Sequence, residues 1–230
     1  MLKTKFQRKW MLLILVMAGT ALSQPAQDGR FPQRGRGQGD SGRSDGRGWS
    51  DRDKQERIDR LSKTLAYQAG LPDPGPEIAF IHARATELLE RTKQVRSNNF
   101  QFDRLARAAD ALLRASYDIL GARKAETHEA DGKRRIALSD DFEKRDAAEF
   151  LQRCYFRIQQ ADYFARLSGE KESKKYVTTA RSLYQQARSA YDALEYDKAR
   201  VLGDAASMIV MALENIAHAS LNIPDPPIIK

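Results

Sequence analysis

Apolar and small residues recur at helical spacing along most of this chain, and this periodicity limits the fold more than any other feature. Within 78–95 and again within 176–194, they alternate at intervals of three and four residues. Such spacing places them on one face of an α-helix. No run of alternating polar and β-branched residues predicts a strand. The first set is Ile78, Ile81, Ala85, Leu88, Thr92 and Val95. The second set is Tyr176, Ala180, Leu183, Ala187, Ala190 and Leu194.

Residues 54–222 are expected to form one helical domain of about six helices. Gly70, Gly121 and Gly169 each follow a helical stretch and are expected to end it. The expected helix starts are Arg57, Pro76, Phe102, either Ser139 or Asp146, a residue shortly before Tyr176, and a residue before Ala205. Residues 146–149 have the spacing of a capping box.

The last helical stretch is apolar nearly all round over residues 205–213. A helix of this kind is expected at the centre of a bundle. We therefore predict an all-α fold in which antiparallel helical hairpins pack into one elongated bundle. Residues 122–138 are charged and contain Gly132, which indicates an exposed, partly helical connector, and the Pro-rich tail 223–230 is expected to be non-helical.

The two halves of this domain share the order helix, break, long helix, turn, long helix. At an offset of 94 residues, Leu89 aligns with Leu183 and Asp103 with Asp197. Residues 85–119 and 179–213 share only four identities, where unrelated alanine-rich helices would share roughly two. Two explanations are therefore possible: a duplicated three-helix unit, or two unrelated hairpins that share the general features of packed helices.

Residues 1–23 have the pattern of a secretory signal peptide. Four basic residues precede an uncharged stretch from Met11 to Leu22, and Ala21 and Ser23 suit a cut before Gln24. A membrane-spanning helix needs about 20 apolar residues, so a cleaved signal is favoured over an uncleaved anchor. We expect a periplasmic or secreted protein with no stable membrane span after cleavage.

Residues 24–53 are rich in Arg and Gly and nearly free of aliphatic side chains. They hold seven of the chain's 14 glycines, and we expect a disordered leader because so little apolar surface can be buried. Arg-Gly pairs at 34–37 and 47–48 are typical of RNA-binding tracts. In an exported chain we favour a linker whose Asp residues neutralise its Arg, with Phe31 or Trp49 able to dock on a partner.

The charge balance argues against a nucleic-acid partner. The whole chain carries a net charge of +8, but removal of residues 1–23 takes away four basic and no acidic residues and leaves +4. Nucleic-acid-binding domains concentrate positive charge on one face, and a nearly balanced helical domain offers no such excess.

The second hairpin resembles a tetratricopeptide repeat over about 34 residues. Ala187, Tyr196, Ala199 and Ala206 occupy positions where that family places small and aromatic packing residues. The chain departs from the pattern at Gln186, Ala190, Gly203 and Met211, and its helices are long for that family. The resemblance implies antiparallel hairpins that present a groove, and only weakly implies protein binding.

No arrangement typical of catalysis or metal binding stands out in the sequence. Cys154 lies on an apolar helical stripe, so burial is favoured over a reactive thiol or an intermolecular disulfide. His82, His128 and His218 are scattered and lack the spacing of metal ligands. The acidic clusters at 126–131 and 140–143 are mixed with Lys and Arg and favour a solvated surface. We therefore expect no enzyme, metal or cofactor.

Aromatic and basic residues of the second half are the best candidates for a partner or ligand groove. The candidate set is Tyr155, Phe156, Tyr163, Tyr184, Tyr191, Arg181 and Arg188. Phe156 and Tyr163, like Tyr184 and Tyr191, are seven residues apart and share a helix face. Core packing is the favoured interpretation of these aromatic residues, and an aromatic-lined groove is the alternative.

Two functions stay open, and the first is favoured. It is an exported, non-enzymatic scaffold that binds an envelope protein, or a second copy of itself, through a helical groove. The alternative is a bundle that binds a small ligand in its core beside Met208 and Met211.

Overall fold

The protein was analysed as a computed structural model, which describes residues 49–71, 75–128 and 140–221. They form six α-helices and no strand, so the predicted all-α fold is confirmed. The helices are α1 (Asp51–Ala69), α2 (Gly75–Gln94), α3 (Asn99–His128), α4 (Asp140–Ser168), α5 (Ser173–Asp192) and α6 (Tyr196–Ser220). All of these belong to the unit Gly46–Lys230.

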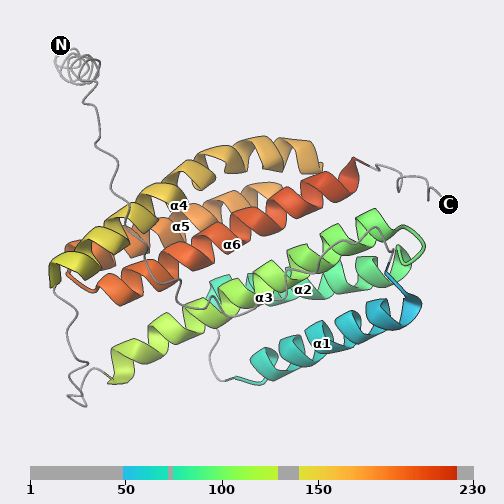
Figure 1. Ribbon diagram of the computed structural model, residues 1–230, viewed down its shortest axis with the longest axis horizontal. Helices are drawn as coiled ribbons and strands as arrows, with labels where there is room; N and C mark the ends of the chain where they lie inside the picture. Colours follow the sequence, from blue (N-terminus) through green and yellow to red (C-terminus); the bar gives the residue numbers. More distant parts are fainter. Residues whose placement is uncertain (1–48, 72–74, 129–139, 222–230) are drawn as a thin grey trace, which may run out of the picture. The chain divides into compact units, whose positions relative to one another are not determined.

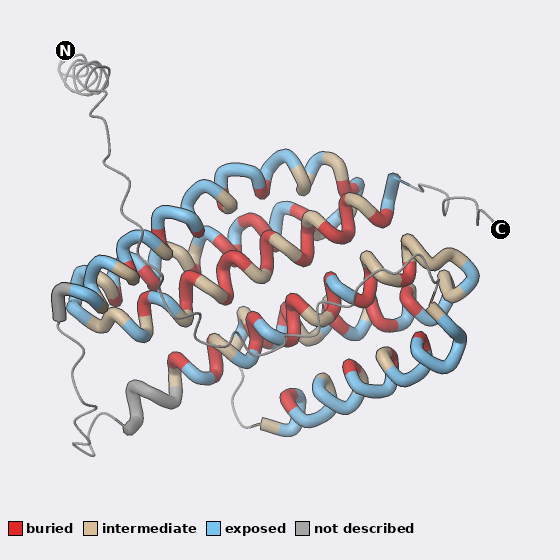
Figure 2. The backbone as a smooth tube through the Cα atoms, in the orientation of Figure 1, coloured by how far each residue is buried: buried red, intermediate tan, exposed pale blue. Residues whose placement is uncertain are grey.

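Helix α6 lies at the centre of the bundle, as its apolar sequence predicts. It packs against α3, α4 and α5 (Figure 1). Buried residues occur along its length, whereas α4 keeps one exposed face (Figure 2). Small residues such as Ala199, Ala206 and Ala212 have no exposed surface, which allows neighbouring helices to approach closely.

The helix contacts repeat the same pattern in the two halves. Helices α1, α2 and α3 pack on one another, α4, α5 and α6 do the same, and α3 joins the first set to the second through α6. This arrangement agrees with a duplicated three-helix unit and equally with two similar hairpin sets, so the duplication stays a prediction.

The first helix begins at Asp51, before the expected Arg57. Ser50 caps it, because its hydroxyl accepts from the Asp53 backbone N–H at 3.2 Å while the Asp53 carboxylate accepts from the Ser50 N–H at 3.3 Å. The Trp49 ring packs on Phe102, with centroids 5.9 Å apart. Residues 49–53 therefore join the bundle, and residues 24–48 of the expected leader lie outside the described part of the chain.

Gly121 does not end a helix, so that prediction is wrong. Helix α3 continues through it to His128, into the predicted connector. Burial of Ala122 and an ion pair of 3.0 Å between Arg123 and Glu77 favour this extra length. An exposed glycine in a helix costs only about 1 kcal/mol, which these contacts offset. Gly70 and Gly169 do lie at helix ends, Gly169 with a positive φ of 65°.

The capping box predicted at Asp146 is also wrong. Helix α4 starts at Asp140, close to the alternative start at Ser139, and Asp146 lies inside it. The Asp146 carboxylate instead pairs with Arg200 of α6 at 3.1 Å. Asp146 thus has the spacing of a capping residue, but its carboxylate joins two helices instead. The connector residues 129–138 and the tail 223–230 lie outside the described residues.

Candidate functional site

Three of the predicted site residues form an exposed aromatic face on α4. Tyr155, Phe156 and Tyr163 are 45%, 59% and 57% exposed. At 100° per residue they lie within about 100° of arc around the helix. Leu151 and Ile158 face the core, about 120–160° around the helix from Phe156 and Tyr163, and Tyr155 lies at the edge of the exposed side. The solvent side of a surface helix is usually polar, whereas α4 also carries aromatic residues there.

Tyr184 of α5 extends this face. Its ring lies 6.0 Å from that of Tyr155, which in turn lies 6.1 Å from that of Phe156. Partial burial raises the pKa of the Tyr184 hydroxyl, and the neighbouring Arg188 opposes that rise through its charge and a hydrogen bond. We call Tyr155, Phe156, Tyr163 and Tyr184 the aromatic surface.

The remaining predicted residues have other roles. Tyr191 is half-buried against the core and packs on Tyr196, with ring centroids 5.4 Å apart, so it is not brought to the aromatic surface. Arg181 forms an ion pair of 2.6 Å with Asp162 and links α5 to α4. Exposed Arg188 stays beside Tyr184, where its charge can reach a partner.

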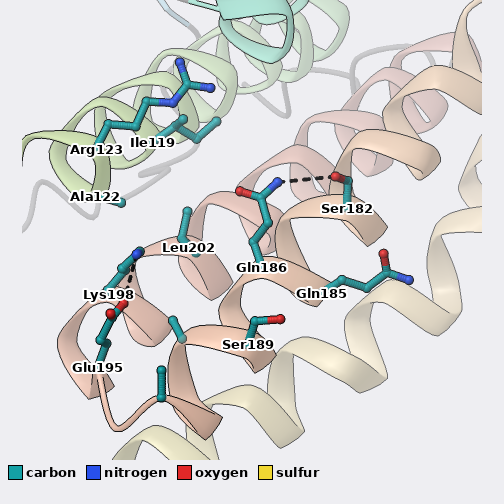
Figure 3. A pocket seen from close by; sticks show the side chains of 12 residues that line it. Ile119, Ala122, Arg123, Ser182, Gln185, Gln186, Ser189, Glu195, Lys198 and Leu202 are labelled. Carbon is teal, nitrogen blue, oxygen red and sulfur yellow. Dashed lines mark hydrogen bonds and ion pairs between the residues drawn. The ribbon is translucent and has the colours of Figure 1, made fainter. Parts of the chain in front are cut away.

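One pocket lies between α3 and α5, over α6. It has a volume of about 500 Å³. Figure 3 shows α3 side chains on one side and polar α5 side chains on the other. Gln186 donates to Ser182 at 3.3 Å, and Lys198 pairs with Glu195 at 2.8 Å. Four of its polar side chains thus already partner one another. The lining residues are Ile119, Ala122, Arg123, Ser182, Gln185, Gln186, Ser189, Ala190, Ala193, Glu195, Lys198 and Leu202.

Another pocket, of about 290 Å³, lies between α1, α3 and α6, and two carboxylates with raised pKa values line it. Burial first, and the negative charge of Asp204 second, raise the pKa of Asp118 to about 6, although Arg114 opposes the shift. Burial also raises the pKa of Asp204 itself. None of the seven predicted site residues lines either pocket.

Comparisons with protein-family models, with curated proteins and with solved structures gave no match. The tetratricopeptide-like spacing of α5 and α6 therefore stays a prediction. Any function must be argued from the surface and pockets of this chain itself.

Sequence reasoning missed Gln68, Asp118 and Asp204 as candidate site residues. One signal was present, because Asp204 is the only charged residue between Val201 and Leu213. A single carboxylate in an otherwise apolar helix is costly to bury without a partner. Asp118 and Gln68 carried no comparable signal, because only the packing of α1 and α3 places them beside Asp204.

The other candidate residues take structural positions. Cys154 is buried as predicted, and its thiol donates to the Gly203 carbonyl at 3.2 Å. Burial raises its pKa, which disfavours the reactive thiolate. His82 lies 2.8 Å from the Ser116 hydroxyl, and burial lowers its pKa. The side chains of 126–131, of His128 and of Asp140 and Asp141 lie outside the described part.

Within that part, no group of three or more His, Cys, Asp or Glu side chains could hold a metal ion. None of the described helices has both the length and the apolar character that a membrane span requires.

The raised Asp118 pKa predicts that the protein loses stability as the pH rises from about 4 to about 6. The folded state binds a proton more tightly than an unfolded aspartate of pKa 3.8, so this contribution is complete below 3.8 and lost through about 6. Asp118→Asn should flatten this dependence and raise the Tm at pH 7.5 by roughly 2–4 °C. Thermal unfolding followed by circular dichroism between pH 4 and 8 measures both effects. The exposed control Asp59→Asn should leave the pH profile unchanged, and an unaltered profile in Asp118→Asn would count against the burial argument.

Proposed function

We propose that this protein is an exported, non-enzymatic helical scaffold that binds a protein partner through the aromatic surface. The observation that carries the proposal is the exposure of Tyr155, Phe156 and Tyr163 on one face of α4. Single exposed apolar residues are ordinary on soluble proteins. Neighbouring aromatic side chains are different, since aromatic residues dominate the binding energy of protein interfaces.

The charges around this face favour an acidic partner segment with apolar side chains. Arg166 follows Tyr163 by three residues on α4, and Arg188 lies beside Tyr184. Both arginines are exposed, and neither forms an ion pair with a described carboxylate. Carboxylates of a partner can pair with them at the rim while apolar side chains cover the aromatic rings.

The location is proposed from residues 1–23 alone, which lie outside the described residues. The charged start, the uncharged stretch and the small residues before Gln24 support export. The mass of the chain recovered from the cell envelope tests this point. Export predicts a chain that begins near Gln24, whereas a chain that retains residues 1–23 would contradict cleavage.

Removing two rings should abolish partner binding. We expect Tyr155→Ala/Phe156→Ala to weaken binding at least 30-fold, because loss of a central aromatic side chain at an interface costs about 2 kcal/mol or more. Tagged full-length wild-type and variant chains are recovered from host envelopes, and each protein that co-purifies with them is quantified. The dissociation constant of each such protein is then measured by titrating it against the purified wild-type and variant chains.

The control is Tyr67→Ala/Phe142→Ala, which removes one Tyr and one Phe that are 68% and 59% exposed elsewhere. This control should bind like the wild type, and both double variants should keep the wild-type helix content. Higher salt should weaken binding of an acidic partner. Equal binding by all three chains would refute the proposal, and a homodimer lost only in Tyr155→Ala/Phe156→Ala would identify a second copy as the partner.

A further inference from the structure

The pocket between α1, α3 and α6 contains a buried hydrogen-bond acceptor with no partner. Gln68 is only 3% exposed and lines the pocket. Its Nε2 donates to the Leu113 carbonyl at 3.0 Å. A carbonyl accepts only from the NH₂ end of an amide, so this bond fixes which way the side chain is turned. The Oε1 then faces no donor among the described residues, and a buried acceptor without a donor is costly.

Two carboxylates of the same pocket also lack a cation of their own. Asp118 and Asp204 form no ion pair with a described residue, and the negative charge of Asp204 adds to burial in raising the pKa of Asp118. The nearest cations are already engaged elsewhere. Arg114 pairs with Asp110 at 2.9 Å, Arg157 with Glu214 at 3.3 Å and Arg200 with Asp146 at 3.1 Å.

The lining as a whole therefore lacks two positive charges. Three carboxylates and one guanidinium line the pocket, which leaves a net charge of −2 when all are ionised. The chain itself carries an excess of positive charge, so this acidic pocket is not part of a generally acidic surface. The remaining lining includes Leu113, Tyr117 and Met208, which offer apolar contacts.

We propose that this pocket binds a small alkyl diamine in its diammonium form. The ammonium groups would lie at Asp118 and Asp204, one of them would also donate to the Gln68 Oε1, and the methylene chain would contact Tyr117 and Met208. Ammonium groups carry three donors and no acceptor, which matches the unpaired carboxylates of Asp118 and Asp204 and the unpartnered Gln68 Oε1.

Size and ligand number favour an organic cation over a metal ion. A pocket of about 290 Å³ is far larger than a bare ion and close to the lower limit for small-molecule sites. Calcium usually takes six to eight oxygen ligands, and the described side chains hold no group of three metal-binding residues.

Binding of the diamine should be coupled to the protonation state of Asp118. Its positive charge relieves the repulsion between Asp118 and Asp204, so binding should release a proton below about pH 6, where Asp118 begins to be protonated. Binding should therefore be weaker at pH 5 than at pH 7.5.

Titration calorimetry of the full-length chain with 1,4-diaminobutane at pH 7.5 tests the inference. We expect saturable binding at one site, weaker binding of n-butylamine, and at least a tenfold loss of affinity in Asp118→Asn, Asp204→Asn and Gln68→Leu. The control Asp59→Asn removes an exposed carboxylate on α1 and should bind like the wild type. Circular dichroism checks that each variant is folded, and Asp118→Asn is the variant expected to gain stability.

Three outcomes would overturn the inference. The first is no binding of 1,4-diaminobutane at millimolar concentration, and the second is equal binding by Asp204→Asn and the wild type. The third is tighter binding of Mg²⁺, Ca²⁺ or Nα-acetyl-lysine methylamide than of the diamine, which would assign the pocket to a metal ion or to a lysine side chain of a protein. Because the test uses no protein partner, its result is independent of the aromatic surface.

Discussion

Replacing Leu213 with alanine is expected to lower the free energy of unfolding by about 2–5 kcal/mol. Leu213 has no exposed surface and lies on α6, the helix that packs against α3, α4 and α5. The loss combines the transfer free energy of the removed carbons with the cavity that rigid neighbours leave open. Denaturant unfolding followed by circular dichroism measures it as a lower midpoint at unchanged slope.

Leu194→Ala is the matched control for this experiment. Leu194 lies in the turn between α5 and α6 and is 69% exposed, so the same atoms are removed without a cavity. We expect a change within about 0.5 kcal/mol. Equal effects of the two substitutions would show that α6 is not the packed centre of the bundle.

Gly203→Val is expected to destabilise the protein by about 1–3 kcal/mol, because there is no room for a side chain there. A Cβ at this position would lie 3.0 Å from Phe150 Cε1 and 3.2 Å from Leu151 Cδ2 of α4. The second methyl group of valine adds to the conflict, since its χ1 angle is restricted in a helix. Thermal and denaturant unfolding measure the loss.

Gly121→Val makes the same chemical change where space is available. Apart from the backbone of its own helix and its chain neighbours, no heavy atom lies within 4 Å of a Cβ built at Gly121, although it too lies inside a helix. Valine has a somewhat higher helix propensity than glycine, so this control should be neutral or slightly stabilising. A loss as large as that in Gly203→Val would contradict the explanation from the close approach of α4 to α6.

Gly203 also illustrates how a family-like pattern and a tertiary contact can differ. The tetratricopeptide spacing expects an aromatic residue at this position, whereas α4 packs against α6 over Gly203 and the Cys154 thiol donates to its carbonyl. The small residue allows a close contact that a large one would prevent. The close contact between α4 and α6 at Gly203 therefore differs from the packing that the tetratricopeptide pattern implies.

Helix identity could be predicted from the sequence because it depends on local spacing. The apolar residues of α2, α5 and α6 recur with the period of a helix, and most of them are buried in the structure. Val95 and Leu194 are exceptions, because they lie past the ends of α2 and α5; Val95 is half-buried and Leu194 is 69% exposed, so the prediction is wrong for Leu194. Helix ends were less predictable where tertiary contacts decide them. Trp49 packing on Phe102 extends α1, and the Arg123 ion pair with Glu77 carries α3 past Gly121.

The aromatic surface could be predicted in part. Spacing alone placed Phe156 and Tyr163 on one face of a helix, but it could not tell whether that face was buried, because burial depends on which neighbours pack beside it. It also grouped Tyr191 with Tyr184, while the structure pairs Tyr191 with Tyr196 across the turn.

The sequence by itself determined the all-α class, the apolar centre in α6, the buried Cys154 and the set of aromatic candidates, since each depends on residue type and helical period. Only the tertiary structure decided that Gln68, Asp118 and Asp204 meet in one pocket. These residues come from α1, α3 and α6, and no local period relates positions so far apart in the chain. Their proximity is a consequence of three helices packing together, and so is the uncompensated charge that the pocket contains.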